Sequence, residues 1–172
     1  MTKQYQYDYP RPALTVDALV VTVKDAQIQV LLIQRKQPPF QHRWALPGGF
    51  VNEGERLLEA AHRELHEETG VVLKHLVPFG TYGDPGRDPR GWTVTVAYLG
   101  IASWNETNAH AGNDAASLQW FPINQLPQLA FDHDGIITDG LLFLRRQVWG
   151  TIEQLPHELS KDDLALLRHL LL

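Results

Sequence analysis

One helical stretch constrains this chain more than any other, because it requires both a buried stripe and a crowded acidic face. Four residues of segment 55–69 recur at intervals of three and four, which places them along one side of a helix: Leu58, Ala61, Leu65 and Thr69. Gly70 follows as a C-cap, since glycine adopts the left-handed conformation that ends a helix at little steric cost. The stretch therefore predicts a helix over 55–69 that packs against a core.

The same helix carries three glutamates on a narrow arc beside the stripe. At about 100° per residue, Glu64 and Glu68 lie about 40° apart, and Glu67 lies about 60° to the other side of Glu64. Glu64 and Glu68 repel each other and weaken the helix by roughly a few tenths of a kcal/mol, unless a cation binds between them. Mg²⁺ and Mn²⁺ prefer such oxygen ligands. A divalent-metal site is one interpretation, and a solvated acidic face is the alternative.

The spacing around these glutamates favours the metal site. Segment 49–71 fits the pattern G-x5-E-x7-R-E-U-x-E-E-x-G-U, where U is aliphatic, at all nine defined positions: Gly49, Glu55, Arg63, Glu64, Leu65, Glu67, Glu68, Gly70 and Val71. A chance match in a chain of this length is on the order of one in ten million. The pattern is that of the Nudix box, so the chain resembles the Nudix hydrolases, which cleave nucleoside diphosphates linked to another group.

The resemblance implies a metal shell and a brace for the loop before the helix. The cofactor it implies is Mg²⁺ or Mn²⁺, and the expected metal-binding residues are Gly48 through its carbonyl, Glu55, Glu64, Glu67 and Glu68. It also implies that Arg63 pairs with Glu55. The expected mechanism is metal-assisted attack of water on a pyrophosphate phosphorus.

The expected catalytic residues are Arg63, Glu64, Glu67 and Asp114. A further carboxylate beyond the box often acts as the base in the family, and Asp114 is the candidate because it lies in a loop just before the strand that carries Trp120. Ser117 stands near the position where the family often has glutamate. A turn cap is the alternative role for Asp114.

A second informative segment, 81–100, carries Arg87 and Arg90 among prolines and glycines. Guanidinium groups suit phosphates because they donate two parallel hydrogen bonds, although these charges could instead pair with aspartates nearby. The segment resembles the ADP-ribose pyrophosphatase branch of the family, in which a proline placed like Pro85 is linked with ADP-ribose activity. The expected substrate-binding residues are Arg43, Arg87, Arg90 and Phe131, and for Phe131 a packing role or a contact with a neighbouring subunit is the alternative. His133 could also line the pocket, with a helix cap or a surface group as the alternative.

A later stretch, 114–137, also resembles the Nudix portion of NAD-metabolism transcriptional regulators that bind ADP-ribose and continue into a winged-helix domain. Because this chain is acidic and ends near its last helix, an enzyme that converts ADP-ribose to AMP and ribose 5-phosphate is the preferred interpretation. The alternatives are a hydrolase of NADH, dinucleoside polyphosphates or oxidised nucleoside triphosphates, and a non-catalytic ADP-ribose sensor.

Composition limits the class of protein and its partners. The chain of 172 residues is long enough for one domain with a sizeable core, and it contains no cysteine for disulfide or thiolate chemistry. It has neither a secretory signal nor an apolar run of roughly eighteen residues, so we expect a cytoplasmic protein that does not enter a membrane. A net charge of −5 argues against nucleic acid as a partner and favours a small nucleotide held by metal and arginines.

Hydrophobic patterns along the chain predict a mixed α/β domain. Strands are expected at 14–23 and 28–35 as a hairpin and at 76–84, 92–104 and 118–123, with further helices at 135–148 and from about Ser160. We expect a single domain over 1–172, with an N-terminal arm at 1–12 and a C-terminal helical extension at 150–172. The resemblance implies a Nudix-type α/β/α sandwich with a mixed β-sheet, and a homodimer.

Overall fold

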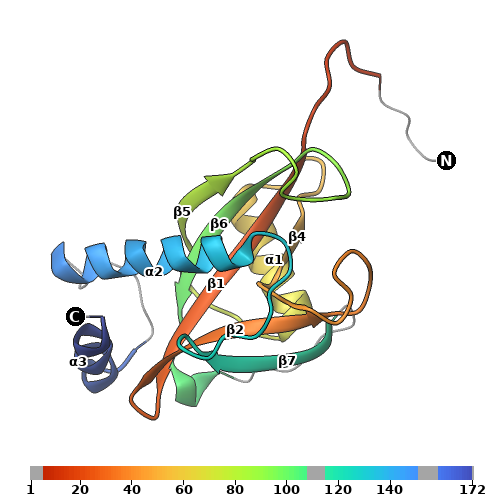
Figure 1. Ribbon diagram of the computed structural model, residues 1–172. Helices are drawn as coiled ribbons and strands as arrows, with labels where there is room; N and C mark the ends of the chain where they lie inside the picture. Colours follow the sequence, from red (N-terminus) through yellow and green to blue (C-terminus); the bar gives the residue numbers. More distant parts are fainter. Residues whose placement is uncertain (1–5, 108–114, 151–158, 172) are drawn as a thin grey trace.

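The computed structural model describes residues 6–107, 115–150 and 159–171, and its centre is a seven-stranded sheet (Figure 1). The strands are β1 (Ala13–Lys24), β2 (Gln27–Arg35), β3 (Trp44–Ala45), β4 (Gly48–Phe50), β5 (Val77–Tyr82), β6 (Thr93–Ile101) and β7 (Ala115–Pro122). The helices are α1 (Leu57–Thr69), the 3-10 turn η1 (Trp104–Glu106), α2 (His133–Gly150) and α3 (Lys161–Leu170). None of the helices in these ranges is long and apolar enough to cross a membrane.

The sheet is mixed, as the sequence predicts. Its main order is β3-β2-β1-β6-β5, in which β1 and β6 run parallel, while the other neighbours are antiparallel. Strand β1 pairs with β2 through residues 21–24 but with β4 through residues 15–17. Because β1 changes its antiparallel partner along its length, β2 and β4 diverge, and the two halves of β1 serve different parts of the molecule.

Alternate residues of β1 face two separate cores. Leu19, Val21 and Val23 pack in the core that also contains buried residues of α2 and α3, including Ile136 and Leu167. The intervening residues, among them Val16, Ala18 and Val20, pack in a second core with α1. Figure 1 shows α2 crossing one face of the sheet while α1 covers the other. The predicted α/β/α sandwich is therefore confirmed.

Helix α1 is shorter than predicted. It begins at Leu57, and Glu55 lies in the loop before it, where its carboxylate accepts a hydrogen bond from the Asn52 N–H at 2.9 Å. The predicted stripe is wrong at its first residue, since Leu58 lies in the first turn and is 44% exposed. Burial begins one turn later, and Gly70 ends the helix at φ 69°, as predicted.

The other predicted elements are present with shifted ends. The hairpin, the later strands and the two C-terminal helices all form, and α2 begins at His133 rather than at residue 135. Ser160 caps α3, because its hydroxyl accepts a hydrogen bond from the Asp163 N–H at 3.1 Å. The described part of the N-terminal arm, residues 6–12, contains no helix or strand.

Helix α2 offers a direct test of its packing on the sheet. A Cβ on Gly140 would lie 2.3 Å from Cδ2 of Leu19 and 3.0 Å from the Phe79 ring, whereas a Cβ on Gly135 would meet nothing within 4 Å. Gly140→Ala should therefore lower the free energy of unfolding by about 1–3 kcal/mol through overpacking. The matched control, Gly135→Ala, should be neutral or raise it by up to about 1 kcal/mol. Urea denaturation measures both, and equal stability of the two variants would contradict this packing.

Candidate active site

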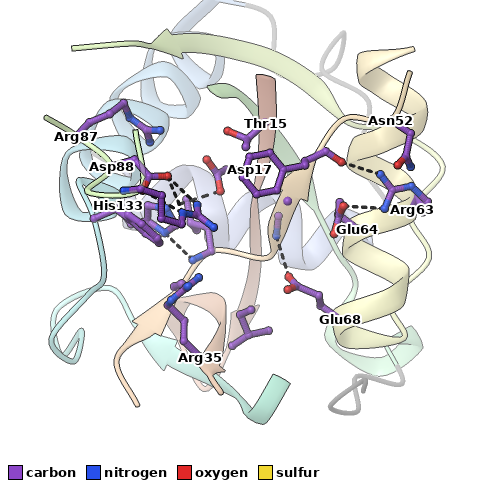
Figure 2. Close-up of a pocket in the computed structure, with 18 residues that line it drawn as sticks. Thr15, Asp17, Arg35, Asn52, Arg63, Glu64, Glu68, Arg87, Asp88 and His133 are labelled. Carbon is purple, nitrogen blue, oxygen red and sulfur yellow. Dashed lines mark hydrogen bonds and ion pairs between the residues drawn. The ribbon is translucent and has the colours of Figure 1, made fainter. Parts of the chain in front are cut away.

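A cavity of about 420 Å³ opens where β2 diverges from β1 and β4 takes its place beside β1. Thr15 and Asp17 of β1 lie at its centre, with α1 on one side and the loop before β6 and the start of α2 on the other (Figure 2). Glu64 and Glu68 project from α1, and Arg35, Arg87 and His133 lie across from them. The cavity thus has an acidic wall and a basic wall that come from different parts of the chain.

Arg63 organises the acidic wall. It donates to Glu55 at 2.7 and 2.9 Å and to Glu64 at 2.6 Å, and its Nη1 lies 3.2 Å from a Glu67 oxygen. It also donates to the Phe50 carbonyl at 3.1 Å. The expected pairing of Arg63 with Glu55 is confirmed. The same guanidinium also offsets the negative charges of Glu64 and Glu67, two of the three glutamates on this face of α1.

Glu64 and Glu68 are the box glutamates that line the cavity, and both lie against the backbone of β4. The Gly48 N–H donates to Oε2 of Glu68 at 2.8 Å. A Cβ on Gly49 would lie 2.6 Å from each oxygen of the Glu64 carboxylate. Glycine at 49 is therefore what lets β4 and α1 approach so closely.

The oxygen atoms of this wall suit a divalent ion, although side chains supply only some of the ligands that the ion needs. Among the described residues, no three Asp, Glu or His side chains form a ready metal-binding group. Mg²⁺ does not need one, because it commonly binds one or two carboxylates together with water and substrate phosphates. Burial raises the pKa of Glu64, Arg63 opposes that shift, and Glu67 and Glu55 add to it. A cation beside Glu64 and Glu68 would stabilise their charged forms.

The remaining expected metal and catalytic residues are placed less centrally. Glu67 is exposed over 56% of its side chain, is not among the residues that line the cavity, and lies against Arg63. Glu55 lies in the loop before α1 and acts through Arg63. Asp114 falls outside the described residues.

Two predicted substrate arginines belong to the basic wall, but each already binds a carboxylate. Arg87 donates to both oxygens of Asp132, at 2.8 and 2.7 Å, and its side chain is 6% exposed. Arg90 binds Asp88 through two nitrogens, at distances from 2.7 to 3.1 Å. The alternative of charges pairing locally holds for Arg90 and Asp88, while Arg87 pairs with a residue 45 positions away.

Arg35 is a cavity residue that the sequence did not single out. It lies at the end of β2, its Nε donates to the Pro39 carbonyl at 2.8 Å, and it forms no ion pair with a carboxylate in the described ranges. Burial lowers the pKa of Arg35, and the charge of Arg90 lowers it further. The sequence feature that could have identified Arg35 is a positive charge at the end of a strand that is otherwise buried, IQVLLIQR.

Phe131 packs its ring beside two arginines of the basic wall. Its φ of +54° is a left-handed conformation that costs a non-glycine residue about 1–2 kcal/mol. The guanidinium carbons of Arg35 and Arg90 lie 4.8 and 5.3 Å from its ring centroid, and the Phe40 ring lies 4.9 Å away. Arg43 is exposed beside Phe40 and is not among the residues that line the cavity.

His133 is the buried member of this wall. Its side chain is 5% exposed, Nδ1 accepts a hydrogen bond from the Leu46 N–H at 2.9 Å, and Nε2 lies 3.7 Å from Asp17. Burial lowers the pKa of His133, which keeps the ring neutral near pH 7. The expectation that it could line the cavity is confirmed, and a surface position is excluded.

The Arg63 network predicts a specific pH dependence of stability. Hydrogen bonds from Arg63 and Asn52 lower the pKa of Glu55 to about 2. A carboxylate with a depressed folded-state pKa stabilises the fold above its unfolded pKa, and this stability is lost as the pH falls toward 2. Glu55→Gln should therefore be less stable than the unchanged protein at pH 7, with the difference shrinking below about pH 4.5. Urea denaturation at pH 7, 5 and 3 measures this.

A matched control for that experiment is Glu59→Gln. Glu59 is 61% exposed, and it lies 3.9 Å from its partner Arg56. An exposed ion pair of this kind contributes little, so this variant should show a small difference at every pH. A gap for Glu55→Gln that stays constant from pH 7 to 3 would contradict the assigned role of Glu55.

Comparison with known proteins agrees with this geometry. The NUDIX domain family model matches residues 13–140. An ADP-ribose pyrophosphatase from Methanocaldococcus jannaschii is 42% identical over 80% of this chain and 77% of its own length. The ADPR responsive transcriptional repressor NtrR of Acinetobacter baylyi is 40% identical, and the match covers 78% of this chain but 55% of the repressor.

Among solved structures, the NUDIX domain of Shewanella oneidensis NrtR complexed with ADP ribose is 37% identical. It superposes with a TM-score of 0.73 and covers 80% of this chain and 94% of its own. The family match spans the core beside α1, the strand residues of the other core, the Arg63 network and both walls of the cavity. This chain therefore belongs to the NUDIX domain family.

Proposed function

We propose that this protein is a divalent-metal-dependent pyrophosphohydrolase that converts ADP-ribose to AMP and ribose 5-phosphate. The observation that carries the proposal is the opposition of two walls in one cavity. Glu64 and Glu68 lie on one side, and Arg35 and Arg87 lie on the other (Figure 2). A pyrophosphate between them would meet metal-binding carboxylates on one side and guanidinium groups on the other.

The choice of ADP-ribose is supported by two kinds of relative. One similar protein is named as an ADP-ribose pyrophosphatase, and the NUDIX domain of another is solved with ADP ribose. Arg87 also lies in the loop that the sequence analysis linked with ADP-ribose activity. A hydrolase of NADH, dinucleoside polyphosphates or oxidised nucleoside triphosphates remains the alternative within the enzyme class.

In the proposed mechanism, the chain's own residues bind and orient the reacting groups. Glu64, Glu68 and the Gly48 carbonyl would hold Mg²⁺ or Mn²⁺. When bound, the ion supplies charge neutralisation at the phosphate oxygens and a water of lowered pKa. Arg63 keeps the Glu64 carboxylate aimed into the cavity through their 2.6 Å contact, and Glu55 and Glu67 support Arg63. Asp114 stays our candidate for the general base.

The basic wall would hold the substrate. Arg35 is suited to bind a phosphate oxygen because it is half-buried and pairs with no carboxylate in the described residues. The Arg87–Asp132 pair fixes the loop before β6 against the residue directly before α2. Arg90 can reach a second phosphate if it leaves Asp88. The rings of Phe131 and Phe50 offer flat apolar surfaces at the cavity, which suits a base or a sugar face.

A second candidate function is an ADP-ribose sensor. One relative is named as an ADPR responsive repressor, and the match spans about half of that protein. The Arg63 network and the cavity glutamates favour an enzyme, because a pocket that only binds does not need a carboxylate pair beside Gly48.

We further propose that the protein acts in the cytoplasm on a small nucleotide and without nucleic acid. We also propose that it forms a homodimer that uses the N-terminal arm, where Tyr7 is 51% and Tyr9 80% exposed.

The proposed activity is tested with Mg²⁺ or Mn²⁺ and a panel that contains ADP-ribose, NADH, diadenosine polyphosphates and nucleoside triphosphates. AMP and ribose 5-phosphate should appear from ADP-ribose, and EDTA should abolish turnover. The double variant Glu64→Gln, Glu68→Gln should lower kcat by at least about a hundredfold, since it removes both cavity carboxylates. Unchanged turnover in this variant would sink the proposal. Tight ADP-ribose binding without metal-dependent turnover in the unchanged protein would select the sensor.

Two arginine-to-alanine variants distinguish a specific role of Arg35 from the general effect of removing a positive charge. Arg35→Ala should raise KM for ADP-ribose about tenfold or more, because a charge-assisted hydrogen bond to phosphate is lost. Arg43→Ala removes an exposed arginine outside the cavity and should change KM less than about twofold. Steady-state kinetics measures both. Equal effects in the two variants would mean that the cavity wall is not the phosphate site.

A further inference from the structure

A buried histidine joins the start of α2 to the segment that leads into β4, and we propose that His133 is a positioning residue for the Gly48 backbone at the metal site. His133 is the first residue of α2 and is 4% exposed. Its Nδ1 accepts a hydrogen bond from the Leu46 N–H at 2.9 Å, across 87 positions of sequence. This proposal rests on the proposed function, because positioning has a purpose only if the Gly48 region holds the metal.

The ring is held by the hydrogen bond at Nδ1, while its other nitrogen faces a carboxylate. Because Nδ1 accepts a hydrogen bond, the single proton of the neutral ring lies on Nε2. Nε2 faces Oδ1 of Asp17 at 3.7 Å, and the other oxygen of Asp17 accepts a hydrogen bond from the buried Thr95 hydroxyl at 2.7 Å. The ring also packs 5.3 Å from the Phe131 ring. His133 is therefore held as an acceptor aimed at Leu46.

Three contacts hold the short segment between β3 and β4. Leu46 is bound through its N–H by His133, the Pro47 carbonyl accepts from the Ala18 N–H at 2.8 Å, and the Gly48 N–H donates to Glu68 at 2.8 Å. Proline has no N–H. The Leu46 N–H is therefore the last backbone donor before Gly48, and His133 is the side chain that binds it.

The consequences of losing this acceptor fall on the metal site. Leu46 is 2% exposed, so its N–H needs a partner inside the protein. Without one, the segment would have to move toward another acceptor, and the shift would pass to Gly48, two residues further along. Gly48 is bound to Glu68, and a Cβ on the adjacent Gly49 would meet Glu64. A displaced segment would therefore disturb both cavity carboxylates and the carbonyl beside them.

The test compares two amides that place an acceptor at different positions. In His133→Asn the side-chain oxygen is separated from the backbone by the same number of bonds as Nδ1, so it can still accept from Leu46. In His133→Gln the amide reaches the position of Nε2 instead. Mn²⁺ binding to the protein without substrate is measured by the loss of the free-ion EPR signal. We expect His133→Asn to bind Mn²⁺ within about threefold of the unchanged protein, and His133→Gln and His133→Ala to bind at least about tenfold more weakly.

The control for the loss of a histidine as such is His75→Ala, because His75 is exposed. This variant should bind Mn²⁺ with unchanged affinity. Thermal unfolding shows which variants are folded, and the Asn–Gln comparison decides alone if His133→Ala is not. Equal Mn²⁺ affinity of the Asn and Gln variants, whether both are strong or both weak, overturns the positioning role. An Asn–Gln difference supports it even if ADP-ribose is not hydrolysed, whereas hydrolysis without that difference leaves the proposed function intact and removes this inference.

Discussion

The acidic wall depends on the hydrogen bonds that the guanidinium of Arg63 donates. This group binds Glu55 from the loop, Glu64 from the cavity side of α1 and the carbonyl of Phe50 at the end of β4. One planar group thereby joins three segments, because a guanidinium can donate in several directions within its plane. Glu64 and Glu67 of α1 can therefore lie close together before any metal binds. A divalent ion would act on a wall that is already assembled, which reduces the ordering that binding requires.

The location of the cavity follows from the change of partner along β1. Residues 21–24 continue the hairpin with β2, while residues 15–17 pair with β4. On the N-terminal side of residue 21, β2 leaves β1, and the polar side chains of Thr15 and Asp17 line the cavity there. Helix α1 then supplies carboxylates from one side, and the start of α2 supplies His133 from the other. The same strand gives its buried apolar residues to the two cores. Fold and site thus share one element.

Local patterns predicted the elements and the acidic wall, but not the partners across the cavity. The period of the apolar residues located α1 and the hairpin, and the spacing of the box identified Glu64 and Glu68. The Arg87–Asp132 and Leu46–His133 contacts join residues 45 and 87 positions apart, and no periodicity encodes such pairs. The prediction that Leu58 is buried was wrong. The helical period shows which side of a helix faces the core, but it does not show how far along the helix the neighbouring sheet extends. Arg35 went unnoticed because a charged strand end ordinarily faces solvent.

The turn at Phe131 shows why a strained conformation is retained at this site. Three consecutive residues there serve different parts of the basic wall: Phe131 packs beside two arginines, Asp132 binds Arg87, and His133 binds Leu46. The left-handed φ of Phe131 turns the chain directly before α2 begins. Its cost of about 1–2 kcal/mol is offset by those three contacts. Because these contacts reach both the loop before β6 and the segment before β4, the start of α2 links the basic wall of the cavity to the strand that lies against the acidic wall.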